Sequence, residues 1–450
     1  MEGLFQISPV DGRYVGKTKA LQPFFSEFGL IRYRVQVEIE YLIALVNVLP
    51  NLPDFSEVQV ERLNKLVSGF SEKDATWIKE KEKVTNHDVK AVEYWIKEQM
   101  TSPEWHPYLE FVHFGLTSQD INNTATPMLL RDAMHQVVLP LLREVIDLVD
   151  ERAEAMRSVP MLARTHGQPA SPTTMGKEWK VFATRLDSVF QDLHAFAFNG
   201  KFGGATGNFN AHLVAYPDID WFDFANVFLR ERLQLNRSIF TTQIDHYDNL
   251  AGLFHAWIRL NTIWVDFCRD IWTYVSMEYF RQKAVKNEVG SSAMPHKVNP
   301  IDFENAEGNL GMANAILGFL AEKLPVSRLQ RDLTDSTVLR NIGVPMAHIV
   351  IALQSIRKGI SKLQLNEQAL SRDLNSNWAV LAEAIQTILR REGVEQPYEK
   401  LKDLTRGQTQ ITQEVLHQFI DGLDVDETVK WEMKHLTPSG YVGGWDHRSA

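Results

Sequence analysis

The chain has 450 residues, of which 44% are hydrophobic and 23% are charged, ordinary values for a globular protein. That length exceeds what one simple core holds, so it predicts two or three domains or a large helical assembly. Lysine and arginine number 47 against 57 acidic residues, and the formal net charge of −10 argues against non-specific binding to nucleic acid.

The cysteine count and the apolar runs bear on the compartment. The single cysteine, Cys268, excludes a disulfide within the chain and fits a reducing environment. The opening MEGLFQISPVDGRY lacks the basic segment and apolar run of a secretory signal. No stretch of 18 consecutive apolar residues occurs, so the sequence predicts no membrane span. We therefore expect a cytoplasmic protein.

Hydrophobic residues recur at helical spacing over long segments, whereas alternating strand patterns are few and short. The long predicted helices are, in chain order, Leu21–Val48, Pro127–Arg157, Gly176–Phe198, Tyr247–Phe280, Ile301–Glu322 and Gly343–Leu363. Glycine and proline fall mainly between these segments, as in RTHGQPASPTT and NGKFGGATGN. We expect an all-α protein with an N-terminal helical domain at 1–111, a central long-helix bundle at 112–365 and a C-terminal helical domain at 366–450.

The clearest helical pattern lies between Tyr247 and Phe280. Apolar residues recur there every seven positions, in two series offset by three: Leu250, Trp257, Trp264 and Ile271, and Leu253, Leu260, Phe267 and Tyr274. This seam is typical of coiled coils and helix bundles, so other long helices must cover it along its length. We interpret its two tryptophans as packing residues.

Several common site motifs are missing or incomplete. GRYVGKT, at residues 12–18, is one residue short of phosphate-binding P-loop spacing and follows no predicted strand. GKFGGATGN, at residues 200–208, lacks the spacing of a dinucleotide-binding turn. The sequence also has no H-E-x-x-H, no Cys/His cluster and no G-x-S-x-G. Nucleotide-triphosphate enzymes, metal hydrolases and serine esterases therefore lose support.

Polar clusters stand instead at the breaks between helices. They are DGRY (11–14), TNHDVKAVEY (85–94), VHFGLTSQDINNT (112–124), ARTHGQPASPTTMGKE (163–178), TTQID (241–245), GSSAMPHKVNP (290–300) and QRDLTDSTVLRN (330–341). Any one of them alone is better explained by helix capping, since Asn, Asp, Ser and Thr are favoured caps. Seven clusters that mix His, Arg, Ser, Thr and Asn favour a shared ligand site.

Three of these clusters resemble the conserved regions of one superfamily. GSSAMPHKVNP is similar to the signature of the fumarase/aspartase superfamily, and GLTSQDINNT and RTHGQPASPTTMGKE resemble its two other conserved regions in the same order. In finer detail, SPVDGRY, TNHDVKAVEY, the histidine in MPHKVNP and RDLTDSTVLRN are similar to the bacterial branch that acts on succinylated purine nucleotides. Only the closing GGWDHRSA differs from the ending expected of that branch.

The resemblance implies a reversible β-elimination that breaks a C–N bond and releases fumarate. A proton leaves the carbon beside a carboxylate, so hydrogen-bond donors and positive charge must stabilise the resulting aci-carboxylate. The departing nitrogen needs a proton from the opposite side. The resemblance assigns His166 as the acid and Ser291 as the base, with Ser292 as a rival for the base. We expect Lys297 to stabilise the serine alkoxide. No metal or organic cofactor is expected.

The resemblance also implies binding roles in the other clusters. The phosphate ligands would be Arg13, Tyr14, Ser336 and Arg340, with Arg331 at the ribose or phosphate. The ligands of the substrate carboxylates would be Thr117, Ser118, Thr165, Gln243, Lys297 and Asn299. Asn86 and Asp88 would flank the nucleotide, and His87 would hydrogen-bond the substrate and orient His166. His113 has a weaker claim and is interpreted as a packed core histidine.

In this superfamily the long helices of four subunits form one central bundle, and each site takes residues from three chains. The resemblance therefore implies a homotetramer with shared sites and small-molecule substrates. Two alternatives stay open. One is argininosuccinate lyase or another fumarate-releasing lyase, although argininosuccinate lyase usually has Gln in place of the histidine of MPHKVNP and needs no phosphate arginines. The other is a catalytically silent structural protein on the same fold.

Overall fold

A computed structural model describes residues 2–283, 294, 298–405 and 411–445. The chain divides into two compact units. Unit 1 comprises residues 1–142, 189–262 and 308–354, and unit 2 comprises residues 143–188, 263–307 and 355–450. These bounds cut through long helices, and the division at 111 and 365 stays a prediction.

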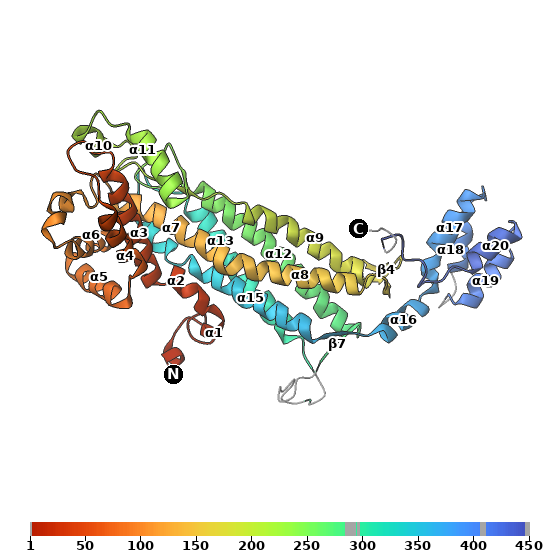
Figure 1. Ribbon diagram of the computed structural model, residues 1–450. Helices are drawn as coiled ribbons and strands as arrows, with labels where there is room; N and C mark the ends of the chain where they lie inside the picture. The colour runs from red at the N-terminus through yellow and green to blue at the C-terminus, as the bar shows by residue number, and fades with distance from the viewer. Residues whose placement is uncertain (1, 284–293, 295–297, 406–410, 446–450) are drawn as a thin grey trace. The chain divides into compact units, whose positions relative to one another are not determined.

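Helices dominate the described residues (Figure 1), and the all-α prediction is confirmed. The first half of the chain holds α1 (Val15–Thr18), α2 (Gln22–Phe25), α3 (Glu27–Val46), α4 (Glu57–Ser68), α5 (Glu72–Thr85), α6 (Asp88–Gln99), α7 (Ser118–Ala133), α8 (Leu139–Ala155), α9 (Met175–His194), α10 (Asn210–Ala215) and α11 (Trp221–Val227). The second half holds α12 (Asp248–Ser276), α13 (Ile301–Lys323), α14 (Thr334–Leu339), α15 (Gly343–Lys362), α16 (Glu367–Asn375), α17 (Ala382–Arg391), α18 (Pro397–Thr405), α19 (Gln413–Asp421) and α20 (Glu427–Lys434).

The described strands are two or three residues long and form four pairs. Three pairs are antiparallel: β1 (Pro160–Met161) with β4 (Thr173–Thr174), β2 (Arg164–Thr165) with β3 (Gln168–Pro169), and β7 (Phe280–Gln282) with β8 (Leu363–Leu365). β5 (Asn199–Gly200) runs parallel to β6 (Asn236–Arg237). These short pairs join helices and form no layer of their own.

Two of the predicted helices differ from the structure by more than a few residues at a boundary or are divided in it. The segment predicted as Leu21–Val48 breaks at Ser26, whose hydroxyl caps α3 by accepting from the Gly29 backbone N–H. Gly29 permits the close packing of this break, because a Cβ there would lie 2.6 Å from the Phe24 carbonyl oxygen. The helix predicted from Pro127 begins earlier, at Ser118, and a π-helical turn at 134–138 joins α7 to α8.

The seven-residue seam is buried as the sequence predicts. On α12, Leu253, Trp257, Leu260, Trp264 and Phe267 are 0% exposed. In unit 2, the Phe267 ring meets Trp179 of α9 edge-on at 5.2 Å and lies 6.4 Å from Phe303 of α13. The two tryptophans of the seam are therefore packing residues, as expected.

Each unit also has a separate apolar core of shorter helices. In unit 1, α3 packs against α4, α5 and α6 through residues such as Val35, Ile39 and Trp95. In unit 2, α17 to α20 lie together (Figure 1). Their core includes the buried residues Ile385, Leu389 and Ile420. These helices lie within 1–111 and 366–450, the ranges that the sequence predicts as helical domains, and the domain division stays a prediction.

One described stretch, Thr334–Lys362, is long and apolar enough to cross a membrane by length and composition alone. Of its most apolar window, 61% is buried inside the protein. A core helix of a soluble protein has the same properties, so this stretch gives a membrane span little support.

Candidate active site

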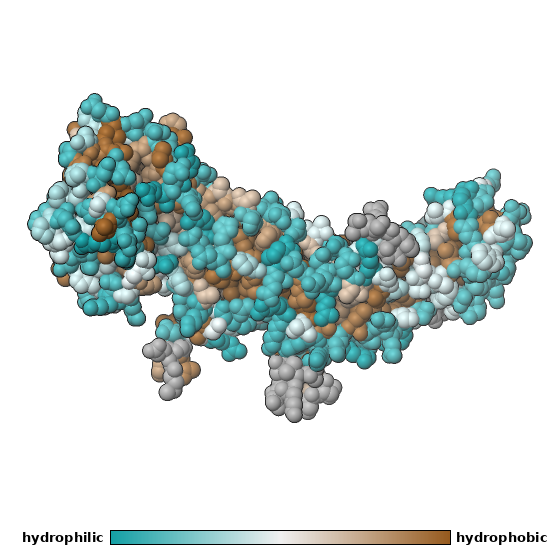
Figure 2. Space-filling view, in the orientation of Figure 1, coloured by the Kyte–Doolittle hydropathy of each residue, from teal (hydrophilic) through white to brown (hydrophobic). Residues whose placement is uncertain are grey.

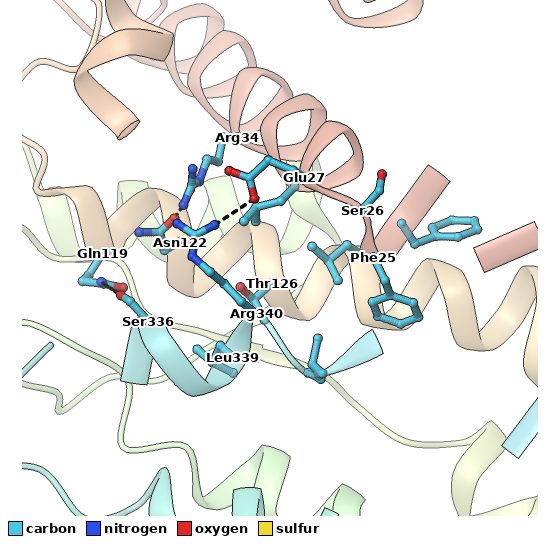
Figure 3. A pocket seen from close by; sticks show the side chains of 14 residues that line it. Phe25, Ser26, Glu27, Arg34, Gln119, Asn122, Thr126, Ser336, Leu339 and Arg340 are labelled. Atoms are coloured by element: carbon cyan, nitrogen blue, oxygen red, sulfur yellow. Dashed lines mark hydrogen bonds and ion pairs between the residues drawn. The ribbon is translucent and has the colours of Figure 1, made fainter. Parts of the chain in front are cut away.

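A pocket in unit 1 brings two predicted phosphate ligands, Ser336 and Arg340, beside α3 and α7 (Figure 3). Its other polar lining residues are Ser26, Glu27, Arg34, Gln119, Asn122 and Thr126, and its apolar lining residues are Phe24, Phe25, Leu30, Leu129, Leu339 and Ile342. Two guanidinium groups, hydroxyls and amides therefore face one space. Such donors suit a phosphate group.

Arg340 lies between two carboxylates. Its Nη1 donates to Glu27 Oε2 at 2.9 Å, and its Nη2 donates to Asp88 Oδ2 at 3.2 Å. The same Asp88 oxygen accepts from Arg34 Nη2 at 2.8 Å. The Arg34 side chain is only 4% exposed, and its Nε donates to Asn122 Oδ1 at 2.8 Å. Asp88 therefore joins α6 to α3 and to the end of α14.

The cationic neighbours also hold Asp88 in its charged form. Burial acts to raise the pKa of Asp88, but Arg34, the Val89 backbone N–H and Arg340 outweigh burial, and the pKa lies below its ordinary value. Asp88 thus stays a carboxylate at neutral pH. It can position the two arginines or accept hydrogen bonds from a nucleotide.

His87 is the N-cap of α6, and its capping hydrogen bond indicates the tautomer of the neutral ring. Its Nδ1 accepts from the Lys90 backbone N–H at 3.1 Å. A nitrogen that accepts carries no proton, so Nε2 carries it in the neutral ring. Nε2 lies 3.4 Å from Ser118 Oγ, so His87 and Ser118, both predicted as substrate ligands, lie together at the ends of two helices. Asn86 precedes them in a left-handed conformation, with φ of 52°, and is exposed.

A buried ion pair stabilises the start of α7, where Thr117 and Ser118 lie. Asp120 forms a capping box with Thr117, whose backbone N–H donates to Asp120 Oδ2 at 2.8 Å. Asp120 Oδ1 accepts from Lys201 Nζ at 2.7 Å, and both side chains are 0% exposed. The backbone N–H groups of Gly203 and Gly204 also donate to Asp120. The glycine-rich segment GKFGGATGN therefore anchors the start of α7.

A second chain of contacts links Ser336 to two more predicted ligands, Arg331 and Gln243. Arg331 Nη2 donates to Ser336 Oγ at 3.1 Å, and its Nη1 lies 3.5 Å from Gln243 Oε1. Gln119 Nε2 donates to Ser336 Oγ at 3.3 Å. Ser336 thus connects the pocket to Gln243 in the segment that precedes α12. Arg13 and Tyr14 precede α1, where the Arg13 guanidinium lies 5.8 Å from the Tyr14 ring centre.

In unit 2, His166 lies at the tip of a tight hairpin between β2 and β3. Thr165 pairs with Gln168, and the turn residues His166 and Gly167 have φ of 54° and 75°. Positive φ at both positions is what a type I′ turn requires. A non-glycine residue in this region stores on the order of 1–3 kcal/mol of strain. Thr165 and His166 are exposed, so packing does not explain the strain at His166.

The remaining predicted residues belong to the GSSAMPHKVNP cluster. Asn299 is half-buried in unit 2, just before α13. Ser291, Ser292 and Lys297 lie outside the described residues. The roles of all these residues stay predictions.

The histidine interpreted as a core residue, His113, is mostly buried and pairs with Glu38. The distance from His113 Nδ1 to Glu38 Oε1 is 2.6 Å, and the two side chains are 17% and 0% exposed. Burial acts to lower the pKa of His113, but Glu38 outweighs it and the pKa is raised. This contact agrees with a structural role.

Sequence reasoning missed several residues that shape the site. They are Glu27 from the first turn of α3, Arg34 and Asn122 from helix interiors, and Lys201 from the glycine-rich segment. No local pattern distinguishes Arg34 from a surface arginine, since its partner Asp88 is 54 positions away. Asp120 did have a signal, because TSQD matches a capping box with Thr117 at the cap.

In unit 1, arginines, hydroxyls and amides line a pocket that can bind an anion, and His87 lies beside Ser118. In unit 2, taken by itself, the imidazole of His166 is exposed at its turn. Among the described residues, no group of three or more His, Cys, Asp or Glu side chains is placed to hold a metal ion.

Family comparisons cover almost the whole chain. Residues 12–318 match the model described as Lyase, and residues 327–442 match the model described as Adenylosuccinate lyase C-terminal. Curated relatives named adenylosuccinate lyase include those of Dictyostelium discoideum, 54% identical over 98% of this chain and 97% of its own, and of Vibrio cholerae, 51% identical over 98% of each. The relative from Escherichia coli K12 is 49% identical over 98% of this chain and 97% of its own.

A solved structure shows the same fold at low identity. The crystal structure of 3-carboxy-cis,cis-muconate lactonizing enzyme from Pseudomonas putida superimposes with a TM-score of 0.72 and 20% identity. The match covers 95% of this chain and 94% of the other. It agrees with the predicted fumarase/aspartase-like fold.

Proposed function

The chain belongs to the adenylosuccinate lyase family, and on that premise we propose that it splits adenylosuccinate into AMP and fumarate, and SAICAR into AICAR and fumarate, in purine biosynthesis. It is a carbon–nitrogen lyase that acts on small molecules. The observation that carries the proposal is the match, at 49 to 54% identity over 98% of the chain, to three curated adenylosuccinate lyases.

His166 is the general acid of the proposed reaction, and Ser291 is the base. Ser291 takes the proton from the carbon beside the carboxylate, the C–N bond breaks as the C=C bond of fumarate forms, and His166 protonates the departing nitrogen. The strained, exposed position of His166 supports this role, because an imidazole held out at a turn can enter a site made by other segments. Lys297 stabilises the Ser291 alkoxide. Thr117, Ser118, Thr165, Gln243, Lys297 and Asn299 hold the substrate carboxylates.

The pocket of Figure 3 is proposed as the phosphate end of the site. Ser336 and Arg340 line it, and Arg331 contacts Ser336. We assign Arg13 and Tyr14 to the same phosphate, and Asn86, His87 and Asp88 to the nucleotide. The contact between His87 and Ser118 supports a shared ligand, because it brings one predicted nucleotide contact beside one predicted carboxylate contact.

The active form is proposed to be a homotetramer in the cytoplasm, with each site built from three chains. Large apolar side chains on the long helices support the assembly: Trp272 is 48% exposed, and Met312 and Phe319 are each 53% exposed. Figure 2 shows such hydrophobic side chains among hydrophilic ones on the surface of the long helices. Exposed apolar surface of this kind commonly marks a subunit interface.

A direct assay tests the proposal. Purified protein is mixed with adenylosuccinate, SAICAR or argininosuccinate, and fumarate is quantified. We expect fumarate from the first two substrates, together with AMP or AICAR. Fumarate from argininosuccinate alone would identify another lyase of the superfamily, and no fumarate from any substrate would favour a silent protein on this fold.

A further inference from the structure

Glu27 is the carboxylate of the pocket that no predicted role accounts for. It lies at the start of α3 and accepts from Arg340 Nη1 at 2.9 Å, the contact drawn in Figure 3. A phosphate bound by Arg340 would therefore lie beside the negative charge of Glu27. Like charges at such distances repel each other, so Glu27 and the phosphate compete for one guanidinium.

The two carboxylates on Arg340 differ in how firmly they are held. Asp88 accepts from the buried Arg34 at 2.8 Å and from the Val89 backbone N–H at 2.8 Å. Glu27 is 41% exposed and has its other partner, Lys79 of α5, at 3.0 Å. Glu27 can therefore turn away from Arg340 and keep an ion pair with Lys79. Asp88 cannot turn away in this sense, because the buried guanidinium of Arg34 would lose its carboxylate partner.

Glu27 is charged when this competition takes place. Burial acts to raise the pKa of Glu27, but the hydrogen bond from Lys79 and the charge of Arg340 outweigh it, and the pKa lies below its ordinary value. A carboxylate with such a pKa keeps its charge across the neutral range. Its effect on a neighbouring phosphate is therefore constant at working pH.

We propose that Glu27 sets the affinity of the site for phosphate-bearing ligands by competing with the phosphate of a nucleoside monophosphate for Arg340. Lys79 receives Glu27 when the phosphate takes its place. The proposal rests on the proposed function, because it takes Arg340 as a phosphate ligand. Its consequence is weaker binding of the nucleotide product and hence faster release.

The matched variants are Glu27→Gln and Glu82→Gln. Glu82 also pairs with Lys79, at 2.6 Å, and it belongs to none of the proposed binding groups. AMP and adenosine binding to the purified full-length protein is measured by calorimetry. We expect Glu27→Gln to tighten AMP binding by roughly three- to tenfold and to leave adenosine binding unchanged, since an exposed charge pair contributes modestly. Glu82→Gln should leave both unchanged.

Lys79→Met should change the affinity for AMP in the opposite direction to Glu27→Gln. Without Lys79, Glu27 has only Arg340 as an ion-pair partner among its described contacts, so AMP binding should weaken. AMP affinity that is unchanged or weaker in Glu27→Gln, or equally tighter in Glu82→Gln, would overturn the proposal. Calorimetry needs no turnover, so failure of this proposal is distinct from failure of the wild-type protein to release fumarate.

Discussion

Arg164 and Asp373 are joined at two points: Nη2 of Arg164 donates to Oδ1 of Asp373 at 3.0 Å and to Oδ2 at 2.7 Å. Arg164 is two positions before His166, and Asp373 belongs to α16. The Tyr279 hydroxyl also donates to Asp373 Oδ2. The first residue of the hairpin that carries the predicted general acid is thus held by an ion pair to α16.

Asp373→Asn should weaken this tie and lower kcat. An imidazole displaced by about 1 Å can cost on the order of a hundredfold in rate, so we expect a loss between about tenfold and a hundredfold with little change in KM. Steady-state kinetics on adenylosuccinate measure both constants. Asp373→Glu should recover part of kcat.

The control for Asp373 is Glu144→Gln, which breaks another two-point pair in unit 2. Arg357 Nη1 donates to both oxygens of Glu144 at 2.8 Å, far from the hairpin in sequence. This variant should keep the wild-type kcat. Equal losses in the two variants, or a change in KM alone for Asp373→Asn, would contradict a positioning role for Asp373.

Arg340→Ala tests the phosphate end of the site. Loss of a hydrogen bond to a charged group costs about 1.5–3 kcal/mol, so KM for adenylosuccinate should rise by about ten- to a hundredfold. Arg328→Ala is the control, because Arg328 is 79% exposed and pairs with Asp332 of the same segment. Steady-state kinetics measure the change. A wild-type KM in Arg340→Ala would remove Arg340 from the phosphate contacts.

Lys201→Met should destabilise the protein strongly. It leaves the buried carboxylate of Asp120 without its cation, and breaking a buried pair in this way costs about 3–5 kcal/mol. Thermal denaturation monitored by circular dichroism measures the loss. Lys65→Met removes an exposed partner of Glu61 and should change Tm little. Similar Tm values for the two variants would show that the buried pair does not stabilise the fold.

His212 makes stability depend on pH in the acid range. Its Nε2 lies 3.0 Å from the Tyr41 hydroxyl, which donates to the Phe114 carbonyl oxygen, so His212 donates to Tyr41 in the neutral ring. Burial lowers the pKa of His212 from 6.5 to about 4. The unfolded chain therefore binds a proton first as pH falls, and stability present above about pH 6.5 is lost between about 6.5 and 4.

The difference between the two pKa values corresponds to a loss of about 3 kcal/mol in the free energy of unfolding. In His212→Gln the amide can replace the donor to Tyr41 without titrating. Tm measured from pH 7 to pH 4 should fall more steeply in the wild type than in this variant. Parallel curves for the two proteins would show that His212 does not contribute.

The sequence predicts the helices better than the contacts between them. The seam of α12 is visible because its burial repeats every seven residues, and its prediction as Tyr247–Phe280 differs from Asp248–Ser276 by only a few positions. The break at Ser26 was missed because both sides of it are apolar and helical in pattern. Proline 127 suggested a helix start, although the capping box at Thr117 opens the helix nine residues earlier.

The sequence indicates residues of the candidate site only where polar residues gather at helix ends, and their roles stay predictions. His87, Ser118, Ser336 and Arg340 stand in such clusters, and the structure brings them near one another within unit 1 through residues of α3 and α7. The sequence does not single out Arg34 and Lys201, because the carboxylate partner of each comes from a distant segment. Tertiary contacts alone distinguish these buried cations from solvated ones.

Because each site is proposed to be built from three chains, we propose that one chain supplies the imidazole of His166 and another supplies the hydroxyl of Ser291 to the same site. The most direct measurement mixes two inactive variants, His166→Gln and Ser291→Ala, carrying different tags, and assays fumarate release from the co-purified mixed oligomers. Random mixing of subunits predicts recovery of up to about a quarter of the wild-type activity, because about a quarter of the sites receive both intact groups. Mixed oligomers that stay as inactive as each variant alone would contradict the account.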